Sequence, residues 1–86
     1  MAQEDVSHDQ LALFRVDGMH CHKCEADIRR SMLLIPGVRE VEVDYASGQV
    51  SVLFARQSAT IEQLADAIVQ LGYRVVEFTQ AQTNLH

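Results

Sequence analysis

Two cysteines separated by two residues, Cys21 and Cys24, carry the most reactive side chains of this 86-residue chain. Both thiols can reach one ion if Cys21 lies in a loop and Cys24 in the first turn of a following helix. A helix N-terminus favours the thiolate form of such thiols, and Lys23 adds a positive charge beside both. Two thiolates suit a soft d¹⁰ ion, above all Cu(I), which accepts nearly linear two-coordinate binding. The spacing therefore predicts Cys21 and Cys24 as metal ligands.

Three alternative roles for the cysteine pair fit the sequence less well. A structural zinc site needs four ligands, and the chain has no second cysteine pair to complete a tetrahedron. Cysteines that merely pack in a core do not normally lie in a loop beside glycine, histidine and lysine. A redox Cys-x-x-Cys motif also lies between a strand and a helix in thioredoxin-like proteins. An oxidoreductase of that type, however, needs a larger βαβ framework and a proline facing the disulfide. Pro36, the only proline, is expected to end a helix.

Length and composition exclude several classes of protein. The chain has room for one domain and no separate substrate lobe, so we do not expect an enzyme with a sizeable substrate pocket. Its net charge of −5 disfavours a general nucleic-acid binder. No apolar run approaches the roughly 20 residues that span a bilayer, and residues 1–10 lack the features of a signal peptide. We expect a cytoplasmic protein with reduced thiols and no membrane contact by this segment.

Periodic patterns predict the elements that position the cysteines. Pro36-Gly37 ends the first predicted helix, and Thr60 with Gln63 forms a capping-box pattern before the second. The apolar residues Ile28 and Met32 lie one helical turn apart and should face the core. Strands and helices are expected in the order β-α-β-β-α-β, at residues 11–16, 22–34, 41–45, 50–54, 61–71 and 73–78. This order predicts an α+β sandwich, a four-stranded antiparallel sheet with both helices on one face.

The predicted domain covers residues 11–78. Residues 1–10 are expected to form a flexible leader, and residues 79–86 a flexible tail or linker, because both segments are polar.

The chain resembles the heavy-metal-associated domain family, which includes CopZ-like copper chaperones and N-terminal domains of copper-transporting P-type ATPases. The family fold is the ferredoxin-like βαββαβ sandwich. The resemblance implies that Cys21 and Cys24 bind Cu(I) and pass it on, without catalysis, to or from a chaperone or ATPase domain of the same fold. The polar ends slightly favour the ATPase domain over a free chaperone. The residues that carry the resemblance are Gly18-Met19-His20-Cys21-x-x-Cys24, Ile28, Met32, Pro36-Gly37-Val38 and Leu71-Gly72-Tyr73.

The resemblance also implies roles for residues around the cysteines. Met19 matches a methionine that anchors the loop in the core and is not a ligand, and Gly18 allows the loop to turn. Tyr73 matches an aromatic residue that shields the thiolates, although an ordinary half-buried core tyrosine is an alternative. Glu25 departs from the family, which usually has a small or apolar residue there. Its charge would slightly oppose ionisation of both thiols.

His20 and His22 flank Cys21 and leave an alternative open. The simpler interpretation is that both are solvated loop residues. Otherwise one of them is a third ligand, which would widen the tolerance to Zn(II) or stabilise a metal-bridged dimer. Unchanged Cu(I) and Zn(II) affinities in His20→Ala and His22→Ala variants would reject a third ligand. The alternatives to copper transfer are a Zn(II)- or Hg(II)-handling domain of the same fold and, in a different class, a thiol–disulfide oxidoreductase.

Charged residues suggest how a partner docks. Lys23, Arg29 and Arg30 lie on the first predicted helix, so the partner should dock there transiently through electrostatic attraction. Ordinary solvated surfaces are the alternative. Acidic residues lie elsewhere, on the second predicted strand and the second helix: Glu40, Glu42, Asp44, Glu62 and Asp66.

Overall fold

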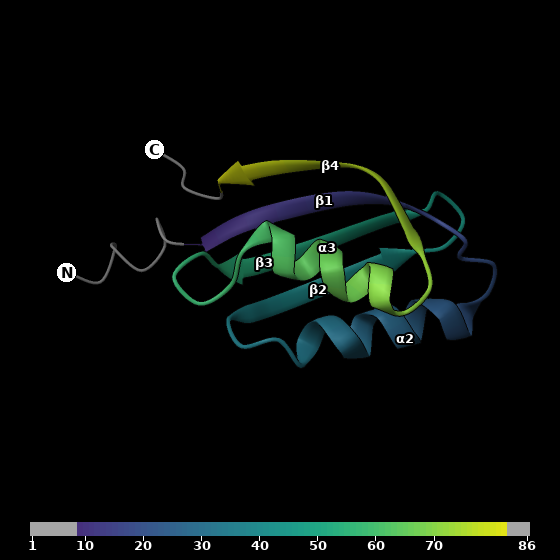
Figure 1. Cartoon of the computed structure of the whole chain (residues 1–86), viewed down its shortest axis with the longest axis horizontal. Helices are drawn as coiled ribbons and strands as arrows, with labels where there is room; N and C mark the ends of the chain where they lie inside the picture. The colour runs from purple at the N-terminus through teal and green to yellow at the C-terminus, as the bar shows by residue number, and fades with distance from the viewer. Residues whose placement is uncertain (1–8, 83–86) are drawn as a thin grey trace.

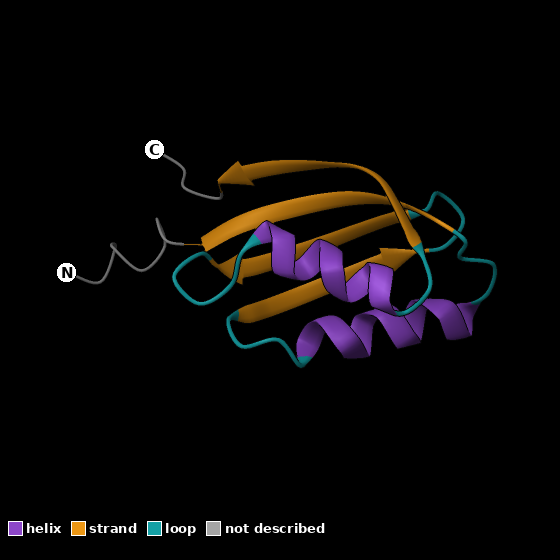
Figure 2. Ribbon diagram, viewed as in Figure 1, coloured by secondary structure: helices purple, strands orange, loops and turns teal. Residues whose placement is uncertain are grey.

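A computed structural model describes residues 9–82 of the chain. Its elements follow the order β1 (Asp9–Asp17), α2 (His22–Leu33), β2 (Val38–Asp44), β3 (Gln49–Ala55), α3 (Ile61–Gln70) and β4 (Arg74–Gln82). The strands form one antiparallel sheet in the order β2-β3-β1-β4. Both helices lie against the same face of this sheet (Figures 1 and 2). The predicted α+β, ferredoxin-like sandwich is confirmed.

The core lies between the helices and the covered face of the sheet. Ile28 and Met32 of α2, one turn apart, are fully buried, and so are Leu64 and Ile68 of α3. Every second residue of a strand faces the same side, and the sheet contributes Ala12, Phe14, Val16, Val41, Val50, Val52 and Phe54 to this core. The predicted apolar stripes therefore meet in a single layer. Within residues 9–82, no helix is long and apolar enough to cross a membrane.

The two helices begin in different ways. At the start of α3, the Thr60 side chain accepts a hydrogen bond from the Gln63 N–H at 3.2 Å. The Gln63 side chain in return accepts one from the Thr60 N–H at 2.9 Å, which confirms the predicted capping box. Helix α2 instead follows Cys21, whose backbone is extended and whose side chain caps no N–H group of the helix. The Cys21 sulfur is therefore available for other contacts.

The outer ends of β1 and β4 were predicted wrongly. β1 begins at Asp9, and β4 runs on to Gln82, so residues 79–82 are paired in the sheet and do not begin a tail. The Gln80 side chain also donates a hydrogen bond to Gln10. Because β4 is an edge strand with one neighbour, backbone pairing extends it without an alternating apolar pattern. Residues 1–8 and 83–86 lie outside the described residues.

The capping box provides a test of the fold. Thr60→Ala removes the acceptor of the Gln63 N–H, and we expect it to lower the free energy of unfolding by about 1 kcal/mol. Thr60→Ser keeps a hydroxyl group and is the matched control. Urea unfolding followed by circular dichroism measures both variants, and equal losses in the two would contradict the role of the cap.

Candidate metal centre

The loop between β1 and α2 is anchored from inside the protein. Met19 is only 7% exposed and packs into the core, as the family resemblance implied. Gly18 has a φ of +107°, a conformation that favours glycine. A Cβ atom at this position would lie 3.2 Å from Cδ1 of Tyr73. Glycine therefore allows both the turn of the loop and the close approach of the Tyr73 ring.

The two cysteines meet at the start of α2. Cys21 is the residue before the helix and is exposed, whereas Cys24 lies in the first turn and is half-buried. Their sulfur atoms are 3.0 Å apart, and both cysteines are free thiols. The predicted placement of one thiol in the loop and one in the helix is confirmed. The arrangement leaves two sulfur atoms side by side at an accessible end of the molecule.

Hydrogen bonds favour the thiolate form of Cys24. Donation from Cys21, from the backbone N–H of His20 and from the Tyr73 hydroxyl lowers the pKa of Cys24 from 9.0 to about 7. The same contact to Cys24, followed by burial, raises the pKa of Tyr73 to about 12. Near neutral pH a substantial fraction of Cys24 is therefore in the thiolate form. Lys23, expected from the sequence to favour the thiolates, is not among the causes that lower the pKa of Cys24.

A second set of contacts joins α2 to the turn after β2. The Glu25 Oε2 atom accepts a hydrogen bond from the Tyr45 N–H at 2.9 Å. The Oε1 atom lies 3.3 Å from Nδ1 of His22, and the His22 ring packs edge-on against the Tyr45 ring with centroids 4.7 Å apart. Both oxygen atoms of Glu25 are therefore engaged. Its predicted opposition to thiolate formation is not among the causes that shift the pKa of Cys24.

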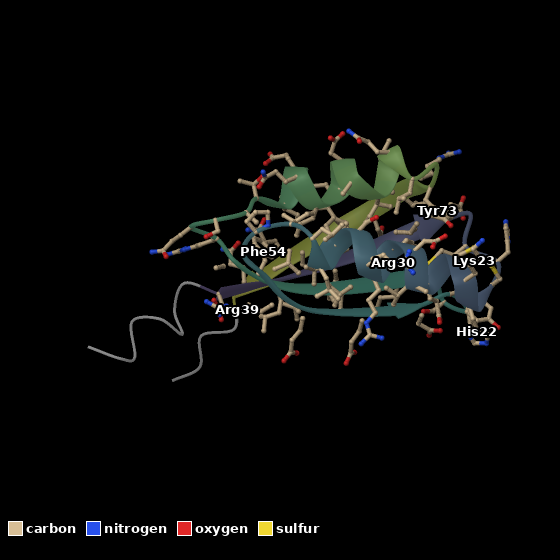
Figure 3. The ribbon with its side chains drawn as sticks, turned by 90° about the horizontal axis from the view of Figure 1, so that it is seen from below. His22, Lys23, Arg30, Arg39, Phe54 and Tyr73 are labelled. Atoms are coloured by element: carbon tan, nitrogen blue, oxygen red, sulfur yellow. The ribbon has the colours of Figure 1, made fainter. Side chains whose placement is uncertain are left out.

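The two histidines that flank Cys21 do not join the sulfur atoms. Both are exposed, and His22 packs against Tyr45. Among residues 9–82, no three histidine, cysteine or carboxylate side chains lie close enough together to hold one metal ion. Figure 3 shows His22 and Tyr73 at the same end of the molecule, on opposite sides of the start of α2 in this view. The two sulfur atoms therefore lie together without a histidine nitrogen completing a three-residue cluster in the described part of the chain.

Comparison with known proteins identifies the family. Residues 13–74, more than half of the chain, match the heavy-metal-associated domain. The chain belongs to this family. Copper chaperone CopZ of Staphylococcus aureus (strain MRSA252) is 36% identical over 64 residues, which cover 74% of this chain and 94% of that protein.

Solved structures agree with this assignment. The structure of a CopZ metallochaperone superposes with a TM-score of 0.75 at 33% identity, covering 77% of this chain and 98% of that one. The Cu(I)-loaded N-terminal domain of a potential copper-translocating P-type ATPase from Bacillus subtilis superposes with a TM-score of 0.73 at 26% identity. That match covers 88% of this chain and 89% of the other. The heavy-metal-associated domain thus has similar structures in both free and ATPase-linked proteins.

The charged residues of this heavy-metal-associated domain lie where partners can reach them. Lys23, Arg29 and Arg30 are all exposed on α2. Lys23 is in the first turn, and Arg30 is in the last, about 10 Å further along the helix axis. The basic cluster therefore extends from the cysteines along the helix. Exposed acidic residues lie on β2 and α3, as expected: Glu40, Glu42, Asp44, Glu62 and Asp66.

The contact between Tyr73 and Cys24 can be tested in the metal-free domain. Because the thiolate is the nucleophile, alkylation of Cys24 should rise as the pH passes about 7. Tyr73→Phe keeps the ring against Gly18 but removes the hydroxyl donor, so the midpoint should move upward from about 7 toward 9.0. The rate of iodoacetamide modification against pH, with Cys24 located by mass spectrometry, measures this midpoint. An unchanged midpoint would rule out the hydroxyl as a donor.

The lowered pKa of Cys24 also makes the free energy of unfolding depend on pH. The folded state lowers the pKa of Cys24 below its ordinary value of 9.0. The stabilisation from these hydrogen bonds is therefore complete above pH 9, and it is lost as the pH falls through about 7.

Proposed function

We propose that this domain binds one Cu(I) ion through Cys21 and Cys24 and transfers it to a partner by exchange of thiolate ligands. The observation that carries the proposal is the accessible pair of sulfur atoms, 3.0 Å apart, together with the lowered pKa of Cys24, about 7, which makes it partly thiolate near neutral pH. Relatives named as a copper chaperone and a copper-translocating ATPase domain support copper as the ion. The domain acts as a carrier and does not turn over a substrate.

The two cysteines take successive parts in the transfer. Cu(I) arrives on two partner thiolates, and the exposed Cys21 attacks it first, losing its proton as the new sulfur–copper bond forms. In the resulting three-coordinate intermediate, one partner bond breaks. The Cys24 thiolate then displaces the second partner thiolate. No electron is transferred, and each departing partner thiolate can take up a proton.

Binding requires the sulfur atoms to separate. Two metal–sulfur bonds of about 2.3 Å in a nearly straight line need more than the present 3.0 Å between the sulfur atoms. Cys21 can supply this movement, because it is exposed and caps no N–H group of α2. Cys24 stays in place, since the His20 N–H and the Tyr73 hydroxyl hold its sulfur. One fixed and one movable ligand suit a site that must accept and release its ion.

The donor set supports Cu(I) over Zn(II), because Zn(II) prefers four ligands and two sulfur atoms satisfy a soft ion. Hg(II) is also a soft ion that two thiolates can hold, so a Hg(II)-handling domain is the alternative within this fold. Competitive titration of the reduced domain with Cu(I), Zn(II) and Hg(II) separates these assignments.

The partner is a domain of the same fold with its own pair of thiolates, either a copper chaperone or a domain of a copper-transporting ATPase. Docking is transient and electrostatic, with the basic residues of α2 facing an acidic surface of the partner. The mechanism needs both thiols reduced, which supports a cytoplasmic location. It is the same whether the domain is a free chaperone or part of an ATPase.

Replacement of either cysteine tests the proposed ligands. We expect the reduced domain to bind one Cu(I) per chain, and Cys21→Ser and Cys24→Ser to weaken binding by more than about 100-fold. Loss of a ligand should exceed the roughly 10- to 100-fold effect of changing a residue behind it. Competition with a chromophoric Cu(I) chelator measures the affinities. Full copper uptake by either variant would contradict the mechanism.

The close thiols and the lowered pKa of Cys24 also fit a thiol–disulfide oxidoreductase. Insulin reduction distinguishes the two classes. A copper carrier should show essentially no activity, and rapid catalysis would favour the oxidoreductase.

The basic cluster on α2 predicts how transfer depends on salt. Arg30→Glu should slow copper transfer to an acidic partner at low salt, and the difference from the unaltered domain should shrink as ionic strength rises. Arg56→Glu makes the same charge change in the loop between β3 and α3, at the far end of the molecule from the cysteines (Figure 1). Stopped-flow transfer rates measure both variants. Equal rates in the two would show that the basic cluster plays no part in docking.

A further inference from the structure

His22 lies between the two cysteines in the sequence, yet its ring contacts Tyr45 and Glu25. Its side chain is 84% exposed. The ring contacts Tyr45 edge-on, and its Nδ1 atom lies 3.3 Å from Glu25. A neutral imidazole is a good ligand for Zn(II). The contacts that hold this ring therefore bear on which metal the site accepts.

Glu25, the residue that holds His22, is itself fixed to the sheet. Its second carboxylate oxygen accepts the Tyr45 N–H at 2.9 Å, and only 25% of its side chain is exposed. Tyr45 is partly buried and packs against the hydrophobic core just after β2. A continuous series of contacts thus runs from the core through Tyr45 and Glu25 to His22.

We propose that Glu25 and Tyr45 are positioning residues that hold His22 away from Cys21 and Cys24 and so disfavour Zn(II). This inference rests on the proposed function, in which the two cysteines hold the ion. A third ligand would bring the site closer to the four that Zn(II) prefers, whereas two thiolates already satisfy Cu(I). Restraining a nearby imidazole therefore penalises the competing ion more than the transported one.

Two variants of Glu25 isolate the restraint from the charge. Glu25→Ala removes both contacts and frees His22. Glu25→Gln also removes the charge, but its amide oxygen can accept the Tyr45 N–H, and its NH₂ group can donate to a neutral Nδ1 of His22. We expect Glu25→Ala to bind Zn(II) about tenfold more tightly than Glu25→Gln. The added replacement His22→Ala should abolish this difference. Competition with a chromophoric Zn(II) chelator measures all four proteins.

The ring nitrogens of His22 give an independent readout. Addition of Zn(II) should shift their ¹⁵N resonances in Glu25→Ala and leave them unchanged in Glu25→Gln, as an effect on folding alone would not. Circular dichroism establishes that each variant is folded. Equal Zn(II) affinities in the two variants, or a difference that survives His22→Ala, would overturn the proposal.

The proposed function is tested separately in the same proteins. All Glu25 variants should still bind one Cu(I) per chain through Cys21 and Cys24. Loss of copper binding by the unaltered domain would overturn the proposed function, whereas an unchanged Zn(II) preference with copper binding intact would overturn only the role of Glu25 and Tyr45.

Discussion

The placement of the Cys24 sulfur is the constraint on which the rest of the site depends. This one atom accepts hydrogen bonds from the loop after β1, from the Cys21 thiol and from Tyr73 just before β4. It therefore ties together segments that are distant in the sequence, and its pKa falls as a result. Cys21 has no comparable restraint and is exposed. In the proposed function, a fixed sulfur atom beside a movable one reconciles two opposing needs of a carrier, namely holding a metal ion and releasing it.

The fold supports this site without burying it. Met19 anchors the loop between β1 and α2 in the core. Contacts on either side of α2 limit the movement of the start of this helix. On one side Tyr73 lies against Gly18, where any Cβ would crowd the ring. On the other, Glu25 joins the first turn of the helix to Tyr45. The apolar core lies below this end of the molecule, so the exposed residues around the sulfur atoms do not form part of it.

Much of this arrangement could be predicted from sequence because it depends on local patterns. Periodic apolar residues such as Ile28 and Met32 located the helices, and Thr60 with Gln63 marked the start of α3. The contacts of Glu25 could not be found this way, since they join residues 20 positions apart. The cause of the lowered pKa of Cys24 was also missed, because it depends on hydrogen bonds from Cys21, from a loop N–H group and from Tyr73, and not on neighbouring charge. The end of β4 was predicted wrongly because backbone pairing with β1, and not a side-chain pattern, extends that edge strand.

Copper K-edge X-ray absorption of the Cu(I)-loaded domain, at one ion per chain and without added thiol, tests the central claim most directly. If Cys21 and Cys24 alone hold the ion while Glu25 and Tyr45 restrain His22, the first coordination shell contains two sulfur atoms and no nitrogen. A nitrogen atom in that shell would contradict the account.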